Sequence, residues 1–542
     1  MKHLILVGIL FVAAFFRFYN LSQVPPSPSL DEVSIGYNAY SILTTGKDEY
    51  GSVLPMLLRA YDDFRPALYV YLTIPFVWVL GLTVVAVRLP SVLLSLITVY
   101  VTYLIGRMVG KKYLSFERLG EIAAVILAVS PWHIYISRLG HEANIGLTLT
   151  TLGIFFFLRA VFSGKKSSWI LAGIAFGLSL HGYQSEKVVI PLLVLFGSYL
   201  FWKEIRKAKR HALIAIVVGF AIALPAIAAT VSPQGMVRFR ATSAFSTDSP
   251  RAVSAVQSYI ASKEKGDIIG RIIYSKAVTN ASIFIENYAS HFSPVWLFSG
   301  SNREAHKVPG MGLLYLWEAP FLLLGLWALG KSRIPKHLAA FLIAGLLVAP
   351  IPGAITTQAP HAMRAYTEIP IMQLIEALGA WVLISKLKKK QLQIFALILG
   401  MLISAGVVKY WQGYFVRFPA EQSDSFQYAI RGAVQYGLDN ANRYTAIQFS
   451  NQGSLYQSYM FFLYYSKFDP AAYHALGGTG SGGFEEAHYI GKYAFGILPQ
   501  QAEKIIPGTL YFYDAKNVPQ GARTLETFSN LDGKPAITAT TL

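Results

Sequence analysis

Long apolar runs dominate this sequence, and they constrain its fold more than any other feature. Several runs of roughly 18 or more residues carry few charges, which is the length that a helix needs to cross a bilayer. The chain has 542 residues, of which 54% are hydrophobic and only 14% are charged. Because a soluble chain is about 25% charged, the surplus apolar surface must face lipid. The sequence therefore predicts an α-helical polytopic membrane protein.

The net charge of +18 is distributed in short basic groups that separate the apolar runs. These groups are "GRMVGKK", "SGKKSS", "WKEIRKAKRH", "GKSRIPKH" and "SKLKKK". Loops that carry Lys and Arg in this way are cytoplasmic under the positive-inside rule. The basic groups therefore indicate topology in a cell membrane, and we expect no nucleic-acid partner.

Placing the basic groups inside gives about eleven spans, with the N-terminus cytoplasmic and the C-terminus outside. The first run, about 4–18, begins with charge but lacks a clear cleavage site, so it predicts an uncleaved span. If the stretch "RPALYVYLTIPFVWVLGL" crossed the membrane, the basic group "GRMVGKK" would fall outside, against the charge rule. We therefore expect this stretch to be a helix that lies at or dips into the membrane surface. The remaining spans are expected at about 84–106, 120–137, 145–162, 168–182, 188–202, 211–229, 311–330, 337–352, 366–385 and 391–410.

Three long segments fall outside the membrane in this topology: residues 19–83, residues 230–310 and the tail after Tyr410. The tail contains the strand-like runs "YTAIQFS" and "GTLYFYD" and the helical run "DSFQYAIRGAVQYGL", which predict a small α/β domain. Its Gly-rich "LGGTGSGGFEE" lacks the phosphate-loop pattern and indicates a flexible loop. We expect two domains, 1–410 and 411–542, the second extracytoplasmic.

Two adjacent carboxylates, Asp31 and Glu32, follow the first span in "PPSPSLDEVSIGYNAYSILTTG". Ser29 and Glu32 fit a capping box at the start of a helix, so the pair could be purely structural. In the alternative interpretation Glu32 is taken up by the cap and Asp31 is left ionised at the helix start. A carboxylate placed in this way can act as the general base that deprotonates a hydroxyl acceptor during sugar transfer.

A phosphate leaving group also needs cations to stabilise its developing charge. The predicted topology places four polar turns on the same outer face as Asp31. They are "RLGHEANIG" with His141 and Glu142, "HGYQSEKVVIP" with Tyr183, Gln184 and Lys187, "HFSPVWLFSGSNREAHKVPGMG" with Arg303 and His306, and "TTQAPHAMRAYTEIP" with His361 and Arg364. Each turn alone is typical of a membrane interface, but together with an acidic loop they favour a site.

The opening module carries a family resemblance. "LDEVSIGYNAYSILTTGKDEYG", "DDFRPALYVYLTIP" and "VAVRLPSVLLSLITVYVTYLIGRMVG" resemble the GT-C type glycosyltransferases related to protein O-mannosyltransferases and aminoarabinose lipid A transferases. "SHFSPVWLF", "NREAHKVPGMGLLYLWEAP" and "PHAMRA" are similar to later parts of the same group, over about the first 400 residues.

The resemblance implies a membrane enzyme that takes a sugar from a polyprenyl-phosphate donor and transfers it, with inversion, at the outer face. By their place in the family motifs, Asp31 would be the catalytic carboxylate, with Glu32 beside it and Glu142 as a second acidic residue. Arg303, His306 and Arg364 are the candidates for the donor phosphate, because Arg offers a bidentate fork. Lys187 and Arg65 are further candidates. The acceptor would be a protein, lipid or glycan hydroxyl.

The chain has no cysteine, which excludes thiolate catalysis and Cys-ligated metals. No dense metal-ligand spacing is present, so we expect a metal-independent reaction. If a divalent cation were used, Asp31, Glu32 and Glu142 would be its ligands.

Two other functions fit a polytopic chain. A transporter or lipid-sugar flippase is the main alternative, but such proteins show repeats and ionisable residues within spans. Here the charges lie at span ends and in loops, and no repeat is evident. A membrane scaffold that binds a partner through its tail would leave the acidic loop and the cationic turns without a role.

Overall fold

The computed structural model describes residues 2–61, 63–246, 249–300, 306–331, 333–480, 483, 486–501, 504 and 506–541. Contacts group the chain into two compact units. Unit 1 comprises Met1–Phe16, Leu94–Ile136 and Ala143–Lys409, and unit 2 comprises Arg17–Leu93, Ser137–Glu142 and Tyr410–Leu542. The polypeptide passes between them several times, so unit 2 combines the 17–93 segment with the tail. The expected division at residue 410 stays a prediction.

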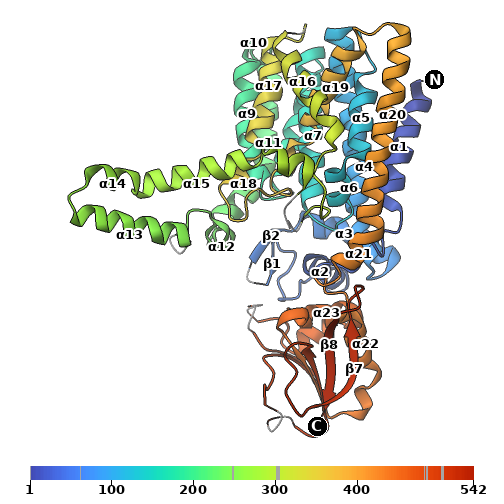
Figure 1. Ribbon diagram of the computed structural model, residues 1–542, viewed down its shortest axis with the longest axis vertical. Helices are drawn as coiled ribbons and strands as arrows, with labels where there is room; N and C mark the ends of the chain where they lie inside the picture. Colours follow the sequence, from blue (N-terminus) through green and yellow to red (C-terminus); the bar gives the residue numbers. More distant parts are fainter. Residues whose placement is uncertain are drawn as a thin grey trace. The chain divides into compact units, whose positions relative to one another are not determined.

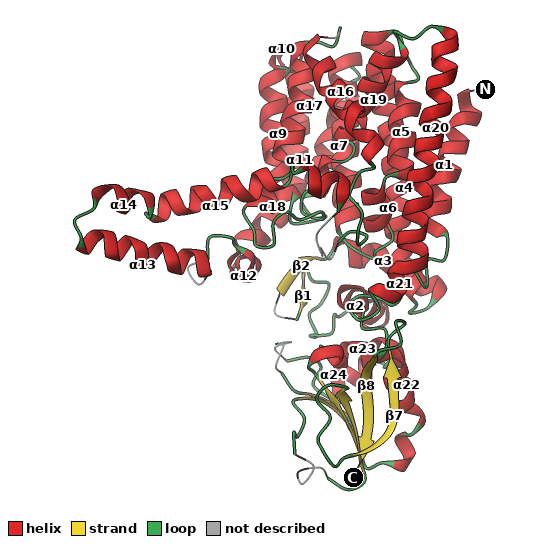
Figure 2. Ribbon diagram, in the orientation of Figure 1, coloured by secondary structure: helices red, strands yellow, loops and turns green. Residues whose placement is uncertain are grey.

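Unit 1 is helical (Figures 1 and 2). Its helices are α1 (Lys2–Phe18), most of α4 (Val84–Val109), α5 (Leu119–Val129), α6 (Pro131–Ser137), α7 (Ala143–Ser163), α8 (Lys166–Ser179), α9 (Glu186–Leu200), α10 (Trp202–Lys207), α11 (Lys209–Val231), α12 (Pro233–Thr242), α13 (Pro250–Glu264), α14 (Ile268–Ile273), α15 (Lys276–Ser290), α16 (Ala319–Lys331), α17 (Lys336–Val348), α18 (Ile351–Ala354), α19 (Ile371–Ile384) and α20 (Lys389–Trp411). Short π or 3-10 turns η1 to η4 lie at Gly110–Leu114, Val295–Ser299, Leu316–Glu318 and Tyr366–Glu368.

Close helix packing in unit 1 depends on small residues. The helix α8 packs against α7 and α11, and α19 packs against α5 and α16. A Cβ added at Gly379 would lie 2.0 Å from the carbonyl oxygen of Phe321. Small residues at such crossings are typical of helices in membranes, where association depends on close van der Waals contact.

Six helical segments of the described chain are long and apolar enough to span a membrane, or seven if the bent pair α5 and α6 counts as one. The six are Val84–Leu114, Ala143–Ser163, Lys209–Val231, Lys336–Ala354, Tyr366–Ile384 and Lys389–Glu421. The chain is therefore a multi-pass membrane protein, as expected.

The expected count of about eleven spans is not confirmed. The helices α1, α8, α9 and α16 stand at four of the expected positions, but they have only 17, 14, 15 and 13 residues. Each of these helices is shorter than any of the six segments above. The surface stretch is a helix as expected, α3 (Leu68–Leu80), which contains Pro75.

One buried charge contradicts the expectation that ionisable groups lie only at span ends. Glu376 on α19 is fully buried within the candidate span Tyr366–Ile384. Glu318 is also fully buried in the same unit.

Unit 2 begins with the helix α2 (Leu30–Thr45), the hairpin of β1 (Leu57–Ala60) and β2 (Asp63–Pro66), and α3. Its tail contains η5 (Gln412–Arg417), α21 (Phe418–Glu421), α22 (Ile430–Asp439), η6 (Ala441–Arg443), η7 (Gly453–Leu455), α23 (Ser458–Ser466) and α24 (Pro470–Ala475). The tail's strands are β3 (Ala446–Ser450), β4 (His488–Ile490), β5 (Tyr493–Gly496), β6 (Thr509–Asp514), β7 (Arg523–Ser529) and β8 (Pro535–Thr541).

These tail strands form one mixed sheet in the order β4-β5-β3-β6-β8-β7. The central strand β3 pairs in parallel with β5 and β6, and the other pairs are antiparallel. The rings of Phe449 and Phe512 stack 4.3 Å apart at its centre. The predicted strands at 444–450 and 508–514 and the helix near 424–438 are confirmed, and so is the α/β character of the tail.

A buried carboxyl joins α2's segment to the tail within unit 2. Glu49 is fully buried, and its carboxylate accepts hydrogen bonds from Asn38 Nδ2 at 3.1 Å, Thr479 Oγ1 at 3.0 Å and Tyr459 OH at 3.3 Å. Burial raises the pKa of Glu49 from 4.5 to about 7, although the three donors oppose the shift. The carboxyl is therefore easier to ionise in the unfolded chain than in the folded one.

We predict that this carboxyl makes the stability of the protein depend on pH. Because its pKa is higher in the folded state, its contribution is present below pH 4.5 and is lost as the pH rises through about 7. The loss is on the order of 3 kcal/mol over this range. Thermal unfolding of the full chain in detergent should show a lower Tm as the pH rises, and Glu49→Gln should flatten that slope. Glu526→Gln, at an exposed position of β7, should leave the slope unchanged; equal slopes in all three proteins would contradict the assignment.

Candidate active site

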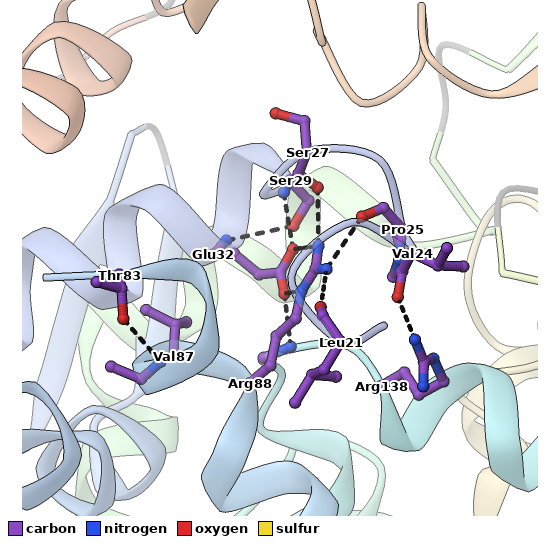
Figure 3. Close-up of polar contacts among 12 residues, drawn as sticks. Leu21, Val24, Pro25, Ser27, Ser29, Glu32, Thr83, Val87, Arg88 and Arg138 are labelled. Atoms are coloured by element: carbon purple, nitrogen blue, oxygen red, sulfur yellow. Dashed lines mark hydrogen bonds and ion pairs between the residues drawn. The ribbon is translucent and has the colours of Figure 1, made fainter. Parts of the chain in front are cut away.

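The site begins at the N-terminus of α2, where the predicted capping box is present. The Ser29 hydroxyl accepts a hydrogen bond from the Glu32 backbone N–H at 3.3 Å. In return, Oε2 of Glu32 accepts one from the Ser29 N–H at 2.8 Å. Figure 3 shows this reciprocal pair. The helix start is thus fixed by its own sequence, as expected.

The Glu32 carboxylate is buried and has four hydrogen-bond donors. It is 1% exposed. Besides Ser29, it accepts from Arg88 Nε at 2.7 Å, Arg88 Nη2 at 3.1 Å and the Gly140 N–H at 2.8 Å. Two of these bonds form a bidentate ion pair, the strongest arrangement for a carboxylate. Glu32 is therefore engaged in holding the structure.

Arg88 uses all of its donors. It lies near the start of α4 and is 0% exposed. In addition to Glu32, its guanidinium donates to the carbonyl oxygens of Leu21 at 2.9 Å, Pro25 at 3.0 Å and Ser27 at 2.8 Å (Figure 3). A guanidinium has five N–H donors in a rigid fork, so one side chain shapes the whole 21–27 loop and joins it to α2.

Arg138, directly after α6, extends the same pattern. Its guanidinium donates to the carbonyl oxygens of Arg17 at 2.9 Å, Val24 at 2.7 Å and Asn20 at 3.3 Å. It also lies over the ring of Phe415, 4.9 Å from the centroid. Two buried arginines thus hold the backbone that precedes α2.

Asp31 points to a different environment from its neighbour. Its side chain is 54% exposed, and Oδ1 lies 3.1 Å from Nη2 of Arg65 on β2. The Arg65 side chain is only 5% exposed. The exposed carboxylate is therefore fixed to a buried cation, while about half of its surface stays accessible.

Glu142 belongs to the same group of charges. It is 3% exposed, and its Oε2 lies 3.7 Å from Nδ1 of His141. Burial alone would lower the pKa of Arg65, but the carboxylates of Asp31 and Glu142 outweigh it and raise the pKa. The structure thus brings together Asp31, Arg65 and Glu142, three of the residues predicted from the sequence.

The remaining predicted cations lie in unit 1. Arg364 Nη1 donates to Thr356 Oγ1 at 2.7 Å and to the Thr357 carbonyl oxygen at 2.6 Å. The Arg364 N–H lies 3.3 Å from Nδ1 of His361, whose ring centroid is 4.9 Å from that of His306. The structure therefore groups His306, His361 and Arg364.

The structure says less about two other predicted residues, Lys187 and Arg303. The Ser185 hydroxyl donates to the Arg364 carbonyl oxygen at 2.9 Å, which places the turn before α9, with Lys187 two residues further on, beside the Arg364 turn. Lys187 itself is half-buried. Arg303 lies outside the described residues.

His291 supports this cluster and was not singled out from the sequence. Burial, with Arg364 nearby, lowers its pKa to about 4, so the ring is neutral at physiological pH. Its Nδ1 lies 2.8 Å from the Asn287 carbonyl oxygen, and its Nε2 lies 3.2 Å from the His361 N–H, which donates to it. A Cβ at Gly353 would lie 2.3 Å from Nε2, so only glycine leaves room for this ring.

The buried arginines and Lys307, which is 3% exposed, were also missed. The signal for Arg88 and Arg138 was present as single arginines beside apolar runs, in "VRLP" and "SRLG". An unpaired arginine in an apolar environment would destabilise the fold, so such an arginine indicates a buried partner. The sequence does not show which residue that partner is.

The described residues contain no group of three or more His, Asp or Glu side chains placed to hold a metal ion. Asp31, Glu32 and Glu142, the ligands expected if a cation were used, do not form such a group. Arginines accompany two of them, Arg65 beside Asp31 and Arg88 beside Glu32. The donor set as arranged therefore does not fit a metal held by these three carboxylates.

The comparisons with known proteins agree on one class. The family model for dolichyl-phosphate-mannose-protein mannosyltransferases matches residues 65–228. This segment begins at Arg65 and includes Arg88 and Glu142, but it lies after Asp31. No curated protein matches the sequence significantly.

Solved structures share the fold. The oligosaccharyltransferase of Archaeoglobus fulgidus aligns over 85% of this chain with a TM-score of 0.52 and 13% identity; the chain spans only 62% of its length. ArnT from Cupriavidus metallidurans aligns over 98% of this chain and 97% of its own, with a TM-score of 0.51 and 11% identity. The fold implied by the resemblance to GT-C type glycosyltransferases is therefore confirmed, and the family match over residues 65–228 agrees with that resemblance.

We predict that Arg88→Met destabilises the protein by about 3–5 kcal/mol, because it leaves the buried Glu32 carboxylate without its cation. The measurement is thermal unfolding of the purified protein in detergent. Arg107→Met is the matched control. Its partner Glu117 lies 3.4 Å away, and both side chains are partly exposed (40% and 27%), so we expect a change below about 1 kcal/mol. Similar losses in both variants would show that Arg88 is not the organising cation.

Proposed function

We propose that this chain is a membrane glycosyltransferase that moves a sugar from a polyprenyl-phosphate donor to a hydroxyl acceptor at the extracytoplasmic face. Support comes from the shared fold and the mannosyltransferase family match. The archaeal enzyme AglB has been solved with a dolichol phosphate, and ArnT with undecaprenyl phosphate. Both carriers present the same chemistry, a single phosphate on a long isoprenoid chain.

The observation that carries the proposal is the difference between two adjacent carboxylates. Glu32 is buried and fully bonded, whereas Asp31 is about half exposed and held at one oxygen by Arg65. A general base must be ionised, fixed in place and accessible to the acceptor. Asp31 meets these conditions, and the core around Glu32 and Arg88 fixes the helix turn that bears it.

In the proposed reaction the acceptor hydroxyl oxygen attacks the anomeric carbon of the donor sugar. The bond from that carbon to the phosphate oxygen breaks, and the lipid phosphate leaves with the electron pair. The hydroxyl proton passes to the Asp31 carboxylate. Attack opposite the leaving group in a single displacement inverts the anomeric centre.

Arg65 and Glu142 have positioning roles in this proposal. When Asp31 takes the proton, Arg65 loses its neutralising partner although its own side chain is buried. The Glu142 carboxylate, which also acts on Arg65, keeps that buried charge compensated. The contact with Asp31 favours this role for Arg65 over binding the donor phosphate.

For the donor phosphate we propose Arg364 and His306, with Lys187 and Arg303 as further ligands. Arg364 is held by Thr356 and Thr357, so its guanidinium is oriented before the donor arrives. An oriented guanidinium loses less conformational entropy when it binds phosphate. The acceptor is proposed to approach through the 19–83 segment and the tail.

We predict that Asp31→Asn abolishes transfer without preventing folding, because the amide is similar in size but cannot accept the proton. Wild type and variant would be purified and assayed with radiolabelled polyprenyl-phosphate sugars and membrane extract as acceptor. Asp532→Asn is the matched control: this aspartate also pairs with a basic residue, Lys534 at 2.7 Å, but in the tail. It should keep full transfer.

The outcomes separate the functions considered. Equal transfer by wild type and Asp31→Asn would support the transferase function but would show that Asp31 is not the general base. Asp31 would then be only a structural residue in the first turn of α2. No transfer by wild type with any donor, together with movement of a labelled lipid-linked sugar across proteoliposome membranes, would establish the flippase instead.

We further predict that Arg364→Gln lowers kcat/KM for the donor by about tenfold or more, because it removes a charge-assisted contact worth roughly 1.5–3 kcal/mol. The effect should be on the donor and leave the acceptor KM unchanged. Arg333→Gln, at an exposed arginine between α16 and α17, is the control and should behave as wild type. A change in the acceptor KM alone would show that Arg364 does not bind the donor phosphate.

A further inference from the structure

Residues 233–290 of unit 1 form a helical arm that the proposed function does not use. It consists of α12, α13, α14 and α15. Figure 1 shows a hairpin in which α13 is one leg, and α14 and α15 lie end to end along the other. The three helices α13, α14 and α15 pack against one another.

The arm buries Ile283 of α15 together with small residues, and most of its large apolar residues are exposed. Ser262 and Gly270 are buried where α13 meets α14, and a Cβ on Gly270 would lie 2.3 Å from the Ser262 hydroxyl oxygen. The exposed apolar residues are Val237, Phe239, Val253, Val256, Ile260, Ile268, Ile269, Ile272, Ile273, Tyr274, Val278 and Ile285. Water is a poor solvent for such a surface.

The exposed apolar residues follow helical faces. On α13, Val253, Val256 and Ile260 recur at i, i+3 and i+7, with exposed fractions of 43%, 56% and 50%. This spacing places them on one side of the helix. Ser254 is also exposed but points to another side. The arm is thus amphipathic.

Both ends of the arm are fixed at the ends of membrane spans. The arm begins just after the candidate span Lys209–Val231. Its other end is held at the candidate span Lys336–Ala354, because Asn287 Nδ2 donates to the Ala354 carbonyl oxygen at 3.1 Å. Tyr288 OH donates to the Leu347 carbonyl oxygen at 2.7 Å.

The start of the arm meets the same span end. The Thr357 N–H donates to the Thr242 carbonyl oxygen at 2.8 Å, and the Ala244 N–H to that of Ile355 at 3.1 Å. In Figure 1 the arm runs crosswise to α9 and α17 within unit 1. Since a span ends where the hydrocarbon core ends, this geometry holds the arm at the level of the lipid headgroups.

The charges of the arm suit an anionic surface. Exposed basic residues accompany the apolar ones: Arg240, Lys263, Lys265, Arg271 and Lys276. The acidic residues Asp267 and Glu286 are engaged, Asp267 as the cap of α14 and Glu286 with Arg251 at 2.7 Å, and Glu264 remains exposed. Juxtamembrane lysine and arginine bind anionic headgroups, at about 1 kcal/mol each.

We propose that the arm lies in the surface of an anionic bilayer, with its valines and isoleucines at the acyl boundary and its lysines and arginines on lipid phosphates. This surface is independent of sugar transfer. A second copy of the chain is a less suitable occupant, because pairing two such arms would bring their basic residues together.

The test uses the absence of cysteine from the sequence, which lets a single introduced thiol carry a fluorescent probe. Val256→Cys and Ile272→Cys report on the apolar faces, and Ser254→Cys is the matched control on the same helix as Val256. Each full-length variant would be labelled with an environment-sensitive dye and reconstituted into vesicles containing phosphatidylglycerol. Lipids with a nitroxide near the headgroup serve as quenchers.

We expect a blue-shifted emission and strong quenching at positions 256 and 272, and neither at 254. Emission typical of water at all three positions would overturn the proposal. Shielding that disappears in nanodiscs holding one copy would assign the surface to a second chain. If Val256→Cys fails to reconstitute, Ile260→Cys replaces it on the same face. Replacing phosphatidylglycerol by phosphatidylcholine should reduce the shift, and an unchanged shift would refute the role of the basic residues.

Discussion

The buried ion pair between Glu32 and Arg88 is the interaction on which the arrangement of unit 2 depends. Both side chains are almost completely buried, and their atoms approach to 2.7 Å. Neither charge could stay there alone, because an unpaired ion in a medium of low polarity costs several kcal/mol. Mutual neutralisation solves this problem only if the remaining donors are also used, and here carbonyl oxygens of the 21–27 loop accept them. The electrostatic requirement of two residues thereby dictates the path of the chain before α2.

This arrangement explains why two carboxylates stand side by side at the start of one helix. Adjacent residues on a helix point about 100° apart, so one can enter the core while its neighbour faces outward. The Glu32 carboxylate makes the contacts with the cap and with the core. These contacts fix the position of Asp31, but they do not use the Asp31 carboxylate. Arg65 and Glu142 then form a local balance of charge around Asp31. In the proposed mechanism, the carboxylate that holds the structure and the carboxylate that takes the proton therefore belong to neighbouring residues with different surroundings.

Local patterns predicted the local features well. The capping box at Ser29 and Glu32, the strands around Phe449 and Phe512 and the helix at Leu68–Leu80 each depend on a few adjacent residues, and each is present. Features that depend on distant partners were not predictable. Arg88 and Arg138 bind backbone carbonyls that no side-chain pattern marks, and His291 gains its role from residues some seventy positions away. The span count of about eleven is not confirmed for a related reason: hydropathy measures how apolar a run is, but not where turns interrupt its helix.

The hydrogen bonds to the buried Glu49 carboxyl have a consequence for how such chains can be rearranged. Asn38 lies on α2, while Tyr459 and Thr479 lie in the tail, and all of them meet one fully buried carboxyl. Tyr37 OH also donates to the Phe468 carbonyl oxygen at 3.2 Å. Exchange of the tail between related proteins by recombination near residue 410 would therefore separate groups that bury one another. A chimaera that keeps these contacts would have to exchange the tail together with the stretch from α2 to Glu49, which includes the helix that bears Asp31.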